Sequence, residues 1–145
     1  MKHNCENTIA IGDFNVNPFE TACISARNMH AIPFSEEVFE KPSRVVSGEE
    51  YKKFYNPTWK LFGNSTPPYS TYYYNKAGHA INYYWNAFDQ VMVRPKLMKA
   101  FDETRLRIIT ETKSHQLINK KGIPDKKKYS EHLPLFCTIR EEEIK

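Results

Sequence analysis

The fold is best interpreted from the segment Thr8-Ile-Ala-Ile-Gly-Asp-Phe-Asn15, which is the first apolar run of the sequence. Its first four residues are apolar or β-branched, the composition of a short strand. Gly12 interrupts the run where a buried strand is expected to end. Asp13 and Asn15 follow at once, so the strand carries a carboxylate and an amide to its end. Taken alone, these two residues are more typical of a turn, because Asp and Asn side chains bond their own backbone.

Outward from this stretch, the chain alternates short strands with few helices. Pro18 suits the first turn of a helix, and Phe19, Ala22 and Ala26 recur at helical spacing through about Met29. Further expected elements are a loop at 30–50, a short helix at 49–55, a helical turn at 96–101, a basic loop at 111–128, a charged tail at 140–145, and strands at 71–74, 88–93, 106–110 and 135–139. The pattern predicts one domain, residues 1–145, of the α/β or α+β class, with one mixed sheet and flanking helices.

The composition is that of an ordinary globular chain of 145 residues, with 40% hydrophobic and 26% charged residues. An aromatic share of 14% argues against wholesale disorder. No apolar run approaches the ~20 residues of a membrane helix. The formal net charge of +4 permits an anionic partner without demanding one.

The cysteines and the N-terminal residues indicate the cellular compartment of the protein. Cys5, Cys23 and Cys137 lack C-x-x-C spacing, which disfavours a disulfide framework or a zinc finger and favours reduced thiols in the cytoplasm. A signal peptide needs an apolar stretch of about 7–15 residues, and the expected strand comes instead. This abrupt start predicts the tail of a longer fold, or a chain that needs a partner.

Two later segments carry further polar groups. Asp89 lies inside the apolar run 88–93, and Glu131 and His132 directly precede the last expected strand. Taken singly, Asp89 is better explained as a solvent-facing edge residue, and His132 as a surface histidine. Together with Asp13 and Asn15 they complete a set: a carboxylate to activate water, donors for a phosphate, and an acid that fixes the tautomer of a histidine.

Three segments follow one another along the chain: Gly12-Asp-Phe-Asn15, the strand that holds Asp89, and Ser130-Glu-His-Leu-Pro134. Their order resembles that in the C-terminal half of the endonuclease/exonuclease/phosphatase superfamily, the deoxyribonuclease-I-like enzymes. The resemblance spans residues 8 to about 139. It implies half of a four-layer α/β/β/α sandwich and a metal-dependent phosphodiesterase or nuclease.

The resemblance also implies roles for individual residues. Asp13 is expected to position or activate the attacking water, and Asn15 to donate to the phosphate. His132 is expected to bond a phosphate oxygen while Asp89 holds it, which requires the two within hydrogen-bond reach and Asp13 and Asn15 in the same pocket. Glu131, where the family usually has Asp, is expected with Asp13 to hold Mg²⁺ or Mn²⁺. The metal would be weakly held, because the family's N-terminal Glu ligand is absent from this chain.

Other polar residues are candidates for the substrate. Asn17 is a second amide near the first motif, although it and Asn86 are also typical turn formers. Lys126, Lys127 and Lys128 end a loop that has six lysines, and clustered lysines attract nucleic-acid phosphates. A solvated surface loop is the favoured explanation for them, because runs of lysine are common on surfaces. The substrate is left open between DNA, RNA, a phospholipid and an inositol phosphate.

The family's missing N-terminal half has a physical consequence. Two sheets that pack face to face bury their inner faces, so a lone half is expected to expose an apolar sheet face. The expected partner is therefore a separate N-terminal half or a second copy of the chain. Alternatives to the hydrolase are a non-catalytic binding module and a truncated remnant, each keeping relic site residues.

Overall fold

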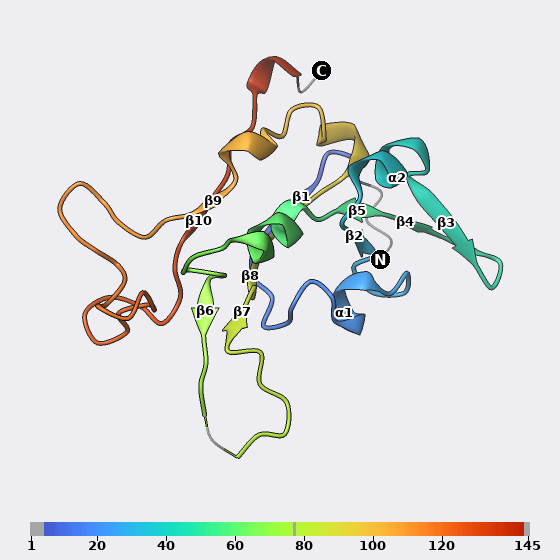
Figure 1. Cartoon of the computed structure of the whole chain (residues 1–145). Coiled ribbons are helices and arrows are strands. Elements are labelled where there is room, and N and C mark those ends of the chain that lie inside the picture. Colours follow the sequence, from blue (N-terminus) through green and yellow to red (C-terminus); the bar gives the residue numbers. More distant parts are fainter. Residues whose placement is uncertain (1–4, 77, 144–145) are drawn as a thin grey trace.

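The computed structural model describes residues 5–76 and 78–143. At its centre lies a four-stranded sheet of order β1–β8–β5–β2 (Figure 1). Its strands are β1 (Ile9–Asp13), β8 (Asp89–Val93), β5 (Phe54–Tyr55) and β2 (Ala31–Ile32). β8 runs antiparallel to both β1 and β5, and β2 runs parallel to β5. The predicted α+β class with one mixed sheet is confirmed.

Shorter elements surround this sheet. Three two-stranded ribbons pair β3 (Ser43–Val46) with β4 (Glu49–Lys52), β6 (Tyr72–Tyr73) with β7 (Trp85–Asn86), and β9 (Arg107–Ile108) with β10 (Leu135–Phe136). The helices are α1 (Thr21–Ile24), α2 (Ser35–Glu40) and the 3₁₀ helices η1 (Pro57–Gly63), η2 (Pro95–Leu97), η3 (Glu103–Arg105) and η4 (Glu141–Glu143). In Figure 1 the ribbon β3–β4 and the loop 111–128 (orange) lie on opposite sides of the sheet. Over the described ranges, no helix is long and apolar enough to cross a membrane.

Strand β8 is the buried centre of the fold. Val91, Met92 and Val93 are all 0% exposed, and full burial of such side chains contributes about 1.5–3 kcal/mol each. Val91 and Val93 belong to one core cluster with Leu61, Leu97, Phe101 and Leu106, whereas Met92 belongs to a second with Cys23, Ala31 and Phe54. Because alternate residues of a strand face opposite sides, the chain covers β8 on both faces.

This covering changes two expectations about the sheet. The bare apolar face predicted for a lone half is absent at β8, since segments on either side of it supply its cover. The first strand, expected to be buried and to end at Gly12, is instead an edge strand that runs through Asp13. Its Ile11 side chain is 55% exposed.

Three expectations for residues 18–55 are wrong. The helix predicted from Pro18 to Met29 is the four-residue α1, which has no side-chain cap and ends where Ser25 turns to an extended conformation. The loop predicted at 30–50 contains β2, α2 and β3. The short helix predicted at 49–55 is two strands, because residues 49–52 pair with 43–46 and residues 54–55 join the central sheet. The strands predicted at 71–74, 88–93, 106–110 and 135–139 are present in shorter form.

Candidate functional site

The first two site residues meet through the register of the central sheet. β1 pairs with β8 so that Asp13, the last residue of β1, lies opposite Asp89, the first residue of β8. The two carboxylates therefore occur at the same end of the sheet. Like charges placed directly opposite in a sheet repel each other. A group that compensates this repulsion is therefore expected close by.

His132 reaches this end of the sheet from the far end of the chain. It forms an isolated antiparallel bridge with Tyr72, and the N–H of Leu133 donates to the Thr71 carbonyl at 2.8 Å. The Ser130 hydroxyl accepts the His132 backbone N–H at 3.1 Å. These backbone hydrogen bonds fix the position of the His132 backbone independently of the contacts of its side chain.

The imidazole of His132 links the two aspartates. Its Nδ1 lies 2.8 Å from Asp89 Oδ2, and its Nε2 lies 4.0 Å from Asp13 Oδ2. Because an ionised carboxylate can only accept, the Nδ1–H of His132 donates to Asp89. This leaves Nε2 directed toward Asp13, with the side chains of His132 and Asp13 22% and 39% exposed. The expected pairing of His132 with Asp89 is confirmed in geometry.

Asn15 shares the turn with Asp13. It is exposed, adopts a φ of 54°, and its backbone N–H donates to Asp13 Oδ1 at 2.9 Å. Asn tolerates this left-handed conformation better than most residues. The turn thus holds the Asp13 carboxylate from its own side and keeps Asn15 beside it.

Asn17 has a structural position instead of the predicted substrate contact. It is 1% exposed. Its Nδ2 donates to Asn86 Oδ1 at 2.9 Å and to Glu20 Oε1 at 3.1 Å, and its Oδ1 accepts the Ala87 N–H at 2.9 Å. Both amide protons are used within the protein, so none is left for a phosphate. Asn17 ties the turn after β1 to the segment that leads into β8.

Glu131 lies on the solvent side of the same region. Burial raises the pKa of the Tyr72 phenol, and the negative charges of Glu131 and Asp13 raise it further. Both carboxylates are therefore close enough to Tyr72 to act on one ring. In the described ranges, no cluster of three or more His, Cys, Asp or Glu side chains is arranged to hold a metal ion.

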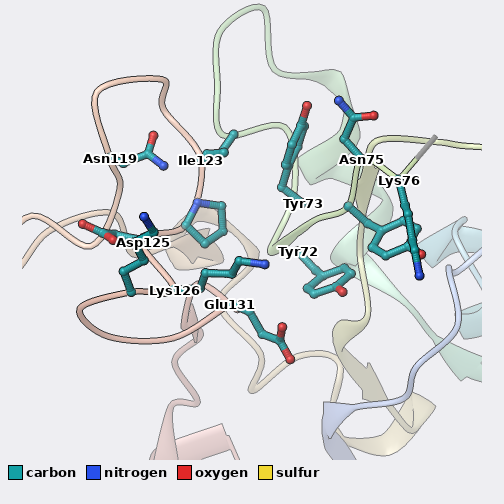
Figure 2. A pocket seen from close by; sticks show the side chains of 12 residues that line it. Tyr72, Tyr73, Asn75, Lys76, Asn119, Ile123, Asp125, Lys126 and Glu131 are labelled. Atoms are coloured by element: carbon teal, nitrogen blue, oxygen red, sulfur yellow. The ribbon is translucent and has the colours of Figure 1, made fainter.

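A pocket of about 660 Å³ lies next to these residues. Glu131 lines it, but Asp13, Asn15, Asp89 and His132 do not, so the expected shared pocket is not found here. Figure 2 shows Tyr72, Tyr73, Lys126 and Glu131 around it. Lys127 also lines this pocket. Lys128 is not a lining residue, but its ammonium group lies 3.9 Å from Oδ2 of Asp125, which is one. Two of the three predicted substrate-binding lysines therefore share a pocket with Glu131.

Sequence reasoning missed Thr71 and Tyr72 as site residues. The Thr71 hydroxyl accepts the Asp89 N–H at 3.4 Å while its carbonyl accepts that of Leu133. The Tyr72 ring packs on the His132 ring at a centroid distance of 4.7 Å and on Phe88 at 5.2 Å. The only signal for them was the tyrosine-rich run at 71–74, which by itself indicates a packed strand.

Comparison of the chain with protein-family models, with curated proteins and with solved structures finds no match. The case for a function therefore depends on the geometry described above.

Proposed function

We propose that this chain contributes the histidine–aspartate half of a phosphodiester-hydrolysing site. The observation that supports it best is the line Asp89–His132–Asp13, with 2.8 Å on one side of the imidazole and 4.0 Å on the other. A histidine held by a carboxylate at one nitrogen and open at the other is suited to proton transfer or to hydrogen bonding with a phosphate oxygen.

Each residue has a distinct part in this proposal. Asp89 accepts the Nδ1 proton and so fixes which nitrogen of His132 meets the substrate. His132 Nε2 donates to a phosphate oxygen, or takes and returns a proton there. Asp13 orients the attacking water as its general base, and Asn15 supplies an exposed amide next to Asp13.

A divalent cation is part of the proposal. Asp13 and Glu131 both lie near Tyr72, and Mg²⁺ typically takes one or two carboxylates together with water and substrate oxygens. Asp13 and Glu131 are the residues that would hold such an ion, with water and substrate oxygens supplying its other ligands. A bound Mg²⁺ would neutralise charge on the phosphate.

A partner is also part of the proposal: a separate N-terminal half or a second copy of this chain. β1 lies at the edge of the central sheet, and edge strands offer main-chain groups to a further strand. The exposed Ile11 of β1 is two residues from Asp13, so a partner that covers it would also enclose the site. Light scattering after size-exclusion chromatography tests for the second copy.

Hydrolysis of bis(4-nitrophenyl) phosphate with Mg²⁺ or Mn²⁺ tests the chemistry. We expect slow turnover above the EDTA control that is abolished in Asp13→Ala and in His132→Ala. His115→Ala is the matched control, because His115 is an exposed histidine bonded to Ser114 and lies outside the site.

The phosphate-binding part is tested without a partner by titrating the chain with inorganic phosphate and following the imidazole signals by NMR. We expect the His132 signals to shift and those of His115 to stay unchanged. Absence of turnover together with unperturbed His132 signals would contradict the proposal and favour a binding module with relic residues.

A further inference from the structure

We infer that the pocket beside His132 binds one unpaired nucleotide of a single-stranded nucleic acid, with the base on the tyrosines and the backbone on the lysines. This deepens the proposed function and rests on it, because it places the scissile phosphate at His132 and a neighbouring base in the pocket. The size of the pocket, about 660 Å³, is in the usual range for small-ligand sites.

Aromatic side chains make one wall of the pocket. The consecutive residues Tyr72, Tyr73 and Tyr74 all line it and are all partly exposed. The rings of Tyr72 and Tyr74 lie 6.4 Å apart and only 17° from parallel. Every nucleobase has a flat face, so an aromatic wall binds bases without requiring one sequence.

Amide and ammonium groups make a second part of the lining, which also includes Ile123 and Pro124. Asn75 and Asn119 line the pocket with the lysines, and Figure 2 shows them on different strands of chain around it. Amides bond the edges of unpaired bases. Lys76, Lys126 and Lys127 outnumber the acidic lining residues Asp125 and Glu131, and Asp125 is already near Lys128. The balance favours an anionic ligand.

The pocket adjoins the proposed catalytic group, although His132 itself is not one of the lining residues. Tyr72 lines the pocket and packs on the His132 ring at 4.7 Å, while Glu131 lines it one residue before His132. A base held there would thus place the adjoining phosphate near the imidazole. Bases inside a duplex are stacked on their neighbours, so a pocket of this kind selects an unpaired one.

Fluorescence anisotropy with labelled 12-nucleotide DNA and RNA strands in EDTA tests the inference. The full chain is compared on a normal strand and on an abasic strand, which keeps the phosphates but lacks the bases. We expect the abasic strand to bind about 5- to 160-fold more weakly, the range for losing the stacking of one base on an aromatic side chain.

Two variants separate the base from the backbone. Tyr74→Leu should weaken the normal strand by a similar factor and leave the abasic strand unchanged, whereas the control Tyr129→Leu, an exposed tyrosine outside the pocket, should change neither. Lys126→Gln/Lys127→Gln should weaken both strands and lower the salt slope by about 0.7 per lysine. Lys120→Gln/Lys121→Gln in the same loop is its matched control. Circular dichroism establishes that each variant is folded.

Several outcomes would overturn the inference: equal affinity for normal and abasic strands, tighter binding to a duplex, competition by a mononucleotide as strong as by the strand, or equal effects of Tyr74→Leu and Tyr129→Leu.

The nucleotide-binding pocket and the phosphodiesterase site can fail independently of each other. If binding depends on the bases but no hydrolysis occurs in Mg²⁺, the proposed hydrolase function is wrong and the proposed nucleotide pocket stands. Hydrolysis of bis(4-nitrophenyl) phosphate without strand binding removes the pocket alone.

Discussion

Asp13 and Asp89 lie directly opposite each other where β1 ends and β8 begins, and His132 lies between their carboxylates. Two acids in this position repel, so the pair is tolerated because the imidazole donates to one of them and faces the other. In this arrangement Nδ1 of His132 is hydrogen-bonded to Asp89, whereas Nε2 is free to bond a substrate.

Asp89→Asn should reduce phosphodiester turnover by about 10²- to 10⁴-fold, the usual contribution of positioned acid–base groups. The amide keeps the size of the side chain but removes the charge that holds the Nδ1–H of His132. Turnover and the ¹⁵N shifts of the His132 ring measure the two effects, and a change of tautomer is expected with the loss of rate. Glu50→Gln, at an exposed position of β4, should leave both unchanged. An unaltered rate in Asp89→Asn would show that Asp89 does not support His132.

Gly12→Ala should destabilise the fold by about 1 kcal/mol or more, because Gly12 has a φ of +152° that residues with a Cβ rarely adopt. There is space around the position, with no atom within 4 Å of an added Cβ, so the cost comes from the backbone. Urea unfolding measures it. Gly63→Ala is the control, since Gly63 also has open space but no φ in the left-handed region. Equal stabilities of the two variants would refute the argument from backbone strain.

Asn17→Ala should cost about 1–3 kcal/mol of stability, because it leaves buried partners such as the Ala87 N–H unsatisfied. The loss should also loosen the turn that holds Asp13, so turnover should fall along with stability. Thermal unfolding and the diesterase assay check the two. Asn28→Ala, whose side-chain bond is exposed, should change stability by less than about 0.5 kcal/mol. A stable Asn17→Ala variant would contradict the structural role given to this amide.

Acidification should destabilise the chain through His30. Burial lowers the pKa of this imidazole below its ordinary value of 6.5, and the positive charge of Arg44 lowers it further. The unfolded chain therefore binds a proton that the folded chain resists, so this contribution is present above about pH 6.5 and is lost as the pH falls below it. Urea unfolding between pH 7.5 and 5 measures the slope, which one such group limits to about 1.4 kcal/mol per pH unit.

His30→Asn should flatten this dependence. Asn is chosen because residue 30 has a φ of 50°, which Asn tolerates. His79→Asn, at an exposed position, should keep the slope of the unaltered chain. An unchanged slope in His30→Asn would assign the pH dependence to other groups.

The strands that carry the candidate site could be predicted from local sequence. The apolar runs at 8–11 and 88–93 each contain a strand, β1 and β8. Asp13, expected just after the first strand, is its last residue, and Asp89, expected inside the second, is its first, so the two lie at one end of the sheet as expected. Short apolar runs bounded by Gly or Pro are a local signal, and a strand's direction then places its end residues. The pairing of His132 with Asp89 followed from the complementary chemistry of the segments together with their resemblance to the superfamily.

Several strand pairings, the burial of Asn17 and the place of Thr71 and Tyr72 at the site depend on contacts that exist only in the folded chain. Residues 31–32 and 54–55 became strands because they pair with each other across the central sheet, and residues 43–46 and 49–52 because they pair as a ribbon. Local propensity carries little information about such pairing. Burial turned Asn17 from a candidate ligand into a structural amide. Thr71 and Tyr72 joined the site because residues 71–72 and 132–133 meet only after the chain has folded, when backbone bonds between segments far apart in sequence aim the imidazole of His132.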